Sequence, residues 1–118
     1  MKMNYFVLGT NDMQAAVQFY DELFEGNEMN KVHSEGRMTL WEGYNFMFAL
    51  AEPFDGKTAT AGNGTMVGFS LGSSSEVERM YNKALAMGGI NEGMPEIRSG
   101  RFSAYVRDLD KNKICLFE

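Results

Sequence analysis

Two stretches of the chain carry apolar residues at helical spacing, and each follows a short apolar run typical of a strand. In the first stretch, Ala16, Phe19, Tyr20 and Leu23 stand at positions i, i+3, i+4 and i+7. This spacing places the four side chains on one helix face and predicts that the face is buried. Gly26 follows as the predicted C-terminal cap, because glycine readily adopts the left-handed backbone that ends many helices.

The second stretch repeats the pattern and adds a helix-start signal. Ser73 and Glu76 have the spacing of a capping box, in which serine and glutamate side chains satisfy the first backbone amides of a helix. Gly88 and Gly89 mark the predicted end of this helix. Its apolar stripe comprises Val77, Met80, Tyr81 and Ala84.

The two halves of the chain form an internal repeat. Tyr20 and Tyr81 are 61 positions apart, and Gly36-Arg37-Met38 corresponds to Gly100-Arg101-Phe102, 64 positions later. Self-similarity of this kind indicates a duplicated supersecondary unit. Each half is predicted to contain a strand, a helix and three further strands. The strands are expected near residues 3–9, 28–33, 37–42, 46–50, 65–71, 91–97, 101–107 and 112–117.

These units predict an α+β fold in a single domain that spans residues 1–118. Residues 1–51 form module one and residues 65–118 form module two, each of them a βαβββ unit. Residues 52–64 are rich in Gly, Thr and Ala and are expected to form a linker. We expect the tandem modules to build a curved mixed sheet with a cleft.

Alternation along the strands predicts which side chains face away from the helices. Within residues 66–71 the large apolar side chains occupy the odd positions, and Gly68 and Ser70 leave room on the even face beside Met66. Open faces turned toward one another would enclose the cleft. The predicted open-face positions are Tyr5, Val7, Gly9, Met66, Gly68, Ser70, Lys113, Cys115 and Phe117.

Composition and charge narrow the function. The 118 residues are 44% hydrophobic and 23% charged, as is typical of a globular domain. Eleven Lys and Arg against sixteen Asp and Glu give a net charge of −5, which argues against nucleic-acid partners and anionic membrane surfaces. No apolar run reaches membrane-spanning length, and no signal-peptide pattern is recognised. The single cysteine fits a reducing compartment, so a cytoplasmic location is expected.

One acidic motif has the opening spacing of a calcium-binding loop. Asp108, Asp110 and Asn112 stand at its first, third and fifth positions. Lys113 occupies the position that requires glycine, and the twelfth position would lie beyond the last residue. We therefore expect a turn here and no calcium site.

Two segments carry a family resemblance. The first runs Gly9-Thr-Asn-Asp-Met-Gln-Ala-Ala-Val-Gln-Phe-Tyr20, and the second, with an Asp-x-Asp-x-x-x-Ile ending, runs Tyr105-Val-Arg-Asp-Leu-Asp-Lys-Asn-Lys-Ile-Cys115. Both are similar to segments of the vicinal oxygen chelate superfamily, which includes the glyoxalase and bleomycin-resistance-like proteins. The resemblance implies paired βαβββ modules and a homodimer.

Superfamily members such as glyoxalase and the ring-cleaving dioxygenases bind a divalent metal through His or Glu on the first and last strand of each module. The resemblance carries these positions onto Tyr5, Met66, Cys115 and a residue near Phe48. None of these is the imidazole or carboxylate that such metal chemistry needs. No metal site and no cofactor are therefore expected.

Six residues are candidates for ligand binding. Arg37 and Arg101, at matched positions of the two modules, are suited to clamp a carboxylate or a phosphate, although a surface ion pair is the alternative. The others are Tyr5, Phe48, Met66 and Cys115. Their methionine and aromatic chemistry suits a planar or hydrophobic ligand, with core packing as the alternative.

The leading hypothesis is a metal-independent small-molecule-binding protein that holds, and in the manner of resistance proteins sequesters, its ligand in the cleft. The enzyme alternative is a metal-dependent lyase, isomerase or dioxygenase with relocated ligands such as His33, Glu35 or Glu118. A third alternative is an interaction module in which the two faces simply pack. The sequence does not identify the ligand.

Overall fold

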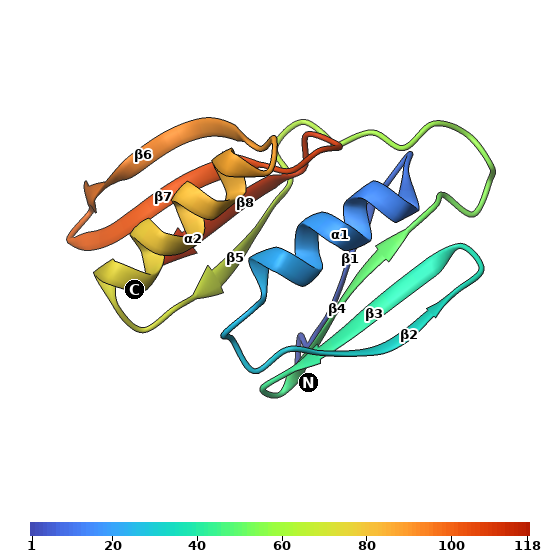
Figure 1. Ribbon diagram of the computed structural model, residues 1–118, viewed down its shortest axis with the longest axis horizontal. Coiled ribbons are helices and arrows are strands. Elements are labelled where there is room, and N and C mark those ends of the chain that lie inside the picture. The colour runs from blue at the N-terminus through green and yellow to red at the C-terminus, as the bar shows by residue number, and fades with distance from the viewer. The chain divides into compact units, whose positions relative to one another are not determined.

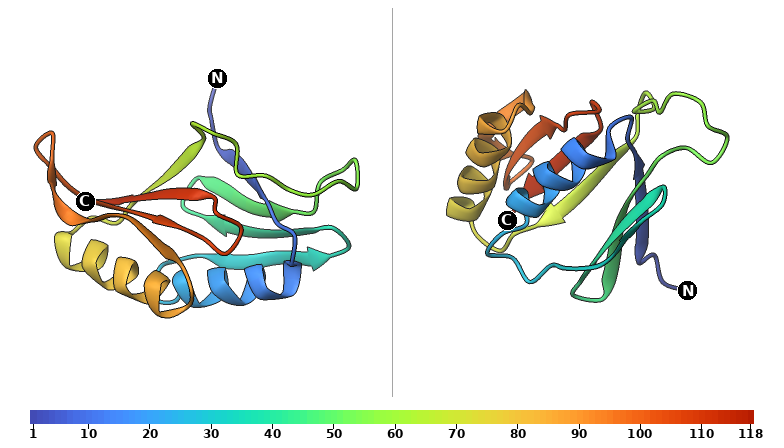
Figure 2. Two further views of the ribbon diagram at one scale, coloured as in Figure 1. Left: turned by 90° about the horizontal axis from the view of Figure 1, so that it is seen from above. Right: turned by 45° about the vertical axis from the view of Figure 1, so that its right-hand side comes forward.

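The computed structural model describes residues 1–118, and the chain forms two compact units, Met1–Thr60 and Ala61–Glu118. Each unit contains one helix and one four-stranded sheet (Figure 1). The α+β class and the βαβββ order of each half are confirmed. Within each unit, the helix lies across one face of its own sheet (Figure 2).

The two units share one topology. The elements of the first are β1 (Tyr5–Gly9), α1 (Met13–Leu23), β2 (Asn30–Glu35), β3 (Met38–Gly43) and β4 (Phe46–Ala51). Those of the second are β5 (Met66–Ser70), α2 (Ser74–Ala86), β6 (Ile90–Arg98), β7 (Arg101–Arg107) and β8 (Lys113–Phe117). The strand orders are β1-β4-β3-β2 and β5-β8-β7-β6, with the first and last strand of each unit parallel.

Both helices begin at a side-chain cap. Asp12 accepts a hydrogen bond from the Ala15 amide at 3.1 Å, and Ser73 accepts one from the Glu76 amide at 3.2 Å. The Glu76 carboxylate pairs with Arg79, so the serine half of the expected capping box is the half observed. Helix α1 is capped at Phe24, two residues before the predicted Gly26, which adopts a left-handed φ of 83°.

The core of the first unit is aromatic. Tyr20 and Phe24 from α1 and its cap pack on Trp41 of β3 and Phe48 of β4, with ring centroids 4.9 to 6.1 Å apart. Trp41 and Phe48 are each 1% exposed. The helix therefore anchors to the middle two strands of its sheet.

The core of the second unit is mainly aliphatic. The buried stripe of α2 is the predicted one, and it faces Ala104 and Val106 of β7 and Ile114 and Leu116 of β8. Alternate residues of β7 and β8 consequently point to the opposite face of the sheet.

Residues 52–65 contain neither helix nor strand. Part of this stretch belongs to the first unit, because Asn11 hydrogen-bonds both the backbone amide and the carbonyl of Ala59, at 2.7 and 3.1 Å. Neither helix has the length and apolar character needed to span a membrane.

Candidate functional site

The open face of the second sheet is built from three rows of paired residues. The middle row contains Gly68, Cys115 and Tyr105. The row on one side contains Met66, Lys113 and Arg107, and the row on the other contains Ser70, Phe117 and Ser103. The parity argument placed Met66, Lys113, Cys115 and Phe117 on this face, and the register confirms it.

Glycine flanks the middle row at both ends, with Gly68 beside Cys115 and Gly93 of β6 beside Tyr105. A Cβ at Gly68 would lie 3.1 Å from Cε1 of Phe117, and one at Gly93 would lie 2.8 Å from Cδ2 of Tyr105. Side chains at these positions would therefore crowd the rings beside Cys115. The two glycines leave this space to the Phe117 and Tyr105 rings.

Three basic side chains lie over the aromatic rings of this face. The guanidinium of Arg98 and the Nζ of Lys113 are each 5.2 Å from the centroid of Tyr105, and the guanidinium of Arg101 is 5.0 Å from that of Phe117. Cation–π contact at these distances is attractive and holds the charges against the sheet. The face thus combines aromatic rings with positive charge.

Two of the basic residues on the face are neutralised by carboxylates. Arg98 pairs with Glu96 at 3.2 Å and also donates to the Ser103 and Met94 carbonyls. Arg107 pairs with Glu92 at 2.8 Å, and this hydrogen bond lowers the pKa of Glu92. Ionic partners therefore fix both arginines.

Cys115 lies at the centre of the face with 8% of its surface exposed. Burial raises the pKa of its thiol above the usual value, because desolvation disfavours the thiolate. A hydrogen bond with Tyr105 and the charges of Arg98, Lys113 and Arg101 act in the opposite direction without overcoming burial. At neutral pH the site therefore presents a protonated thiol.

The structure brings together three of the six predicted binding residues. Met66, Cys115 and Arg101 share the face described above. Arg37, at the matching hairpin of the first unit, lies 5.2 Å above the Phe54 ring and donates to the Glu52 carbonyl at 3.1 Å.

The other two predicted residues lie on opposite faces of the first sheet. Tyr5 pairs with Met47 on the open face and is 51% exposed, whereas Phe48 pairs with Phe6 and is buried beneath α1. The open-face neighbour of Tyr5 on β4 is therefore Met47, and Phe48 serves the core.

The residues considered as relocated metal ligands are divided between the units. His33 and Glu35 lie on β2, where the His33 ring is 3.3 Å from the Glu35 carbonyl oxygen, and Glu118 ends the second unit. The Glu118 carboxylate accepts a hydrogen bond from the Phe102 amide at 3.2 Å. No set of three His, Cys, Asp or Glu side chains has an arrangement suited to a metal ion.

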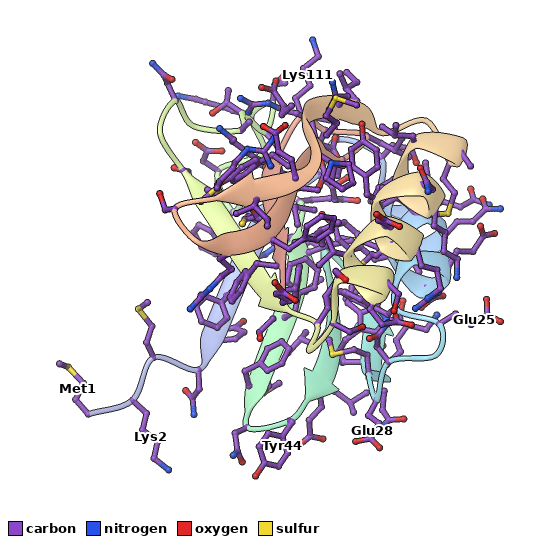
Figure 3. The ribbon with its side chains drawn as sticks, turned by 90° about the vertical axis from the view of Figure 1, so that its left-hand side faces the viewer. Met1, Lys2, Glu25, Glu28, Tyr44 and Lys111 are labelled. Atoms are coloured by element: carbon purple, nitrogen blue, oxygen red, sulfur yellow. The ribbon has the colours of Figure 1, made fainter.

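A concave feature lies on the helix side of the first sheet. It is an open pocket of about 390 Å³ whose lining includes Asp21, Asn27, Lys31 and Trp41. The Asp21 carboxylate accepts a hydrogen bond from Trp41 Nε1 at 3.0 Å and forms an ion pair with Lys31 Nζ at 2.6 Å, so it connects two of the lining residues. The labelled residues Glu25 and Glu28, which border α1 and β2, extend outward at this end (Figure 3).

Sequence reasoning did not select Tyr105, Lys113 or Arg98 as site residues. Alternation along β8 placed Lys113 on the open face without giving it a role, and the same alternation along β7 would have placed Tyr105 there beside Arg101. Arg98 lies on β6, whose pairing with β7 shifts in register between Asn91 and Gly93 and between Gly93 and Glu96. Such irregularities leave no clear pattern in the sequence.

The sequence match to a known family covers almost the whole chain. Residues 2–116 match the Glyoxalase/Bleomycin resistance protein/Dioxygenase superfamily, and the chain therefore belongs to it. No curated protein sequence matches the chain.

Solved structures agree with this assignment. A glyoxalase/bleomycin resistance protein from Albidiferax ferrireducens is 29% identical, with a TM-score of 0.89 over 98% of this chain and 96% of its own. A lactoylglutathione lyase from Agrobacterium tumefaciens is 23% identical, with a TM-score of 0.73 over 99% and 92%. A glyoxalase-related enzyme from Fulvimarina pelagi is 19% identical, with a TM-score of 0.83 over 99% and 87%. Because these last two structures are less than 25% identical in sequence, they show similarity of fold alone.

Proposed function

We propose that this protein binds a small organic molecule without a metal ion, on the open face of the second sheet. The observation that carries the proposal is the Gly68–Cys115–Tyr105 row, flanked by the exposed Met66 and by basic side chains that lie over aromatic rings. Binding sites for small molecules are lined mainly by apolar and aromatic side chains, with a few polar groups that fix orientation. This face supplies both kinds of side chain.

The charges around the face support metal-independent binding. Lys113 and Arg101 repel a divalent cation, and the raised pKa of the Cys115 thiol means that a metal would first have to displace its proton. Met66 provides only a thioether sulfur at the first-strand position. These side chains favour an uncharged or anionic occupant over a metal ion.

The superfamily and the exposed surface both support a homodimer as the working form. Tyr5 and Val7 are 51% and 45% exposed on β1, and Met66 is 47% exposed on β5. Exposed apolar side chains that share one face of a strand, as Tyr5 and Val7 do, commonly mark an interface or a ligand site. We include the dimer in the proposal for this reason.

Native mass spectrometry of the protein purified without chelator tests metal content, subunit number and retained ligand together. We expect a dimer free of stoichiometric metal. A bound divalent metal in every subunit would contradict the proposal and favour a metal-dependent enzyme of the superfamily.

A matched pair of variants tests the location of the site. Gly68→Val adds a branched side chain against Phe117 and Cys115, whereas Ala86→Val adds bulk at an exposed position of α2. For a ligand found by a thermal-shift screen of planar drugs and metabolites, Gly68→Val should abolish the shift and Ala86→Val should preserve it. Equal shifts in both variants would place binding elsewhere, and the melting of each variant without ligand checks folding.

A further inference from the structure

We infer that the occupant of this face is a small planar organic anion, whose acid group is bound between Lys113 and Arg101. The inference rests on the proposed function, because it names the chemical class that the proposed site would accept. It is drawn from the pairing of charges on the face and from the residues between them.

Lys113 and Arg101 are the two basic residues of the face that lack a carboxylate partner. Each is held by an aromatic ring, Lys113 by Tyr105 and Arg101 by Phe117. Glu92, which feels the charge of Lys113 weakly, forms its hydrogen bond with Arg107 instead. An aromatic ring positions a cation without cancelling its charge, so both remain able to bind an acid group.

The contrast with the neighbouring arginines shows that acidic partners are placed selectively. Arg98 and Arg107 lie on the same face and pair with Glu96 and Glu92. The chain carries a net charge of −5, so acidic residues are plentiful. The local positive excess on this face is therefore a property of its arrangement and does not reflect a basic composition.

The two charges lie on either side of Cys115 along β8. Lys113 and Phe117, over which Arg101 lies, are separated by four residues of β8, or about 13 Å along the strand. Cys115 stands between them, and its thiol is within the electrostatic reach of Lys113, Arg101 and Arg98. An acid group near Cys115 is attracted from both sides.

The remaining surroundings call for an apolar, flat body on the same molecule. Gly68 offers no side chain beside Cys115, and Met66 adjoins it with 47% of its surface exposed. Met adapts to the outline of an aromatic ring and contacts it favourably. A polyanion is disfavoured, since the protein as a whole is acidic and would repel an extended phosphate chain.

Three ring compounds of nearly equal shape separate charge from shape: benzoate, neutral benzamide and the benzamidinium cation. Each is titrated to its solubility limit into ¹⁵N-labelled full-length protein at low ionic strength. We expect benzoate to shift the amide signals of β5, β7 and β8. Its affinity should be about tenfold higher than that of benzamide, because benzoate gains one charge-assisted hydrogen bond. Benzamidinium should bind most weakly of the three, and added salt should weaken the binding of benzoate.

Three single-charge variants locate the acid group. Lys113→Gln and Arg101→Gln should each weaken benzoate binding several-fold and leave benzamide unchanged. Lys83→Gln removes the same charge from α2, on the opposite side of the sheet, and should leave the preference for benzoate intact. Amide spectra of the unliganded variants establish that the fold is preserved.

The outcomes distinguish the two proposals. If benzamide or benzamidinium binds the same residues as tightly as benzoate, the anion inference is overturned and the proposed function stands. An unaltered preference for benzoate in Lys113→Gln and Arg101→Gln also overturns it. If none of the three compounds shifts signals from this face, both proposals fail.

Discussion

Asp108 accepts backbone and side-chain hydrogen bonds from Asn112 across the turn between β7 and β8. One Asp108 carboxylate oxygen accepts the backbone amides of Asp110 and Asn112, each at 2.9 Å, and the other accepts the Asn112 side-chain amide at 3.0 Å. Both residues are buried, at 2% and 3% exposure. The motif that has the opening spacing of a calcium loop forms the turn that the sequence analysis expected, and its first carboxylate holds that turn.

Replacing Asp108 should destabilise the protein. Asp108→Ala leaves buried amides without acceptors and should lower the free energy of unfolding by roughly 2–3 kcal/mol. Asp108→Asn keeps an acceptor for the two backbone amides and should cost less. Urea unfolding followed by circular dichroism measures both. A rise in the wild-type midpoint on addition of calcium would contradict this account of the motif.

Asp21 should stabilise the first unit mainly through Trp41. The Trp41 indole is buried and donates to Asp21 at 3.0 Å, so Asp21→Ala should cost about 1–3 kcal/mol. Lys31→Gln breaks only the exposed ion pair to Asp21 and should cost less than about 1 kcal/mol. Denaturant unfolding monitored by Trp41 fluorescence compares them. An equal loss of unfolding free energy in the two variants would show that the hydrogen bond from the Trp41 indole is not the main contribution of Asp21.

Gly93 keeps space for the stacking of Arg98 on Tyr105. A Cβ there would lie 2.8 Å from Tyr105 and 3.0 Å from Nη2 of Arg98, so Gly93→Ala should displace one of them and cost about 1–3 kcal/mol. Tyr105 ring proton shifts in NMR spectra report the displacement. Glu96→Ala is the control, because it removes the ion pair to Arg98 and adds no atoms. Unchanged Tyr105 shifts in Gly93→Ala would contradict the prediction.

Alkaline pH should destabilise the protein through Cys115. Its pKa is higher in the folded than in the unfolded chain, so the folded state retains more protons above the unfolded value of about 9. Stability contributed by the buried thiol is therefore complete below that pH and declines as pH rises toward the folded pKa. Thermal unfolding from pH 7 to 10 measures the decline, which should be smaller in Cys115→Ala. The same slope in wild type and variant would assign the pH dependence to other groups.

The order of elements and the faces of β5 and β8 were predictable from the sequence. Helical spacing identified both helices, and alternation separated Met66 from Val67 and Cys115 from Ile114. These predictions succeeded because each strand has one large-apolar face and one mixed face, so that burial fixes the side on which each residue lies.

The face of β4 was not predictable in the same way. Its six residues are Phe-Met-Phe-Ala-Leu-Ala, which offers no alternation, and only the pairing of Tyr5 with Met47 shows that Phe48 lies in the core. The arrangement of charges on the second sheet was also not predictable from the sequence. It depends on the ion pairs of Arg98 with Glu96 and of Arg107 with Glu92, which no spacing in the sequence predicts.

Every strand of each sheet comes from one half of the chain. The backbone hydrogen bonds of either sheet are therefore complete whichever copy of the other half accompanies it. Two copies of the chain that exchange halves need to redirect only residues 61–65, which follow the Asn11–Ala59 hydrogen bonds, and no strand pair is broken. Domain exchange is therefore inexpensive for this fold.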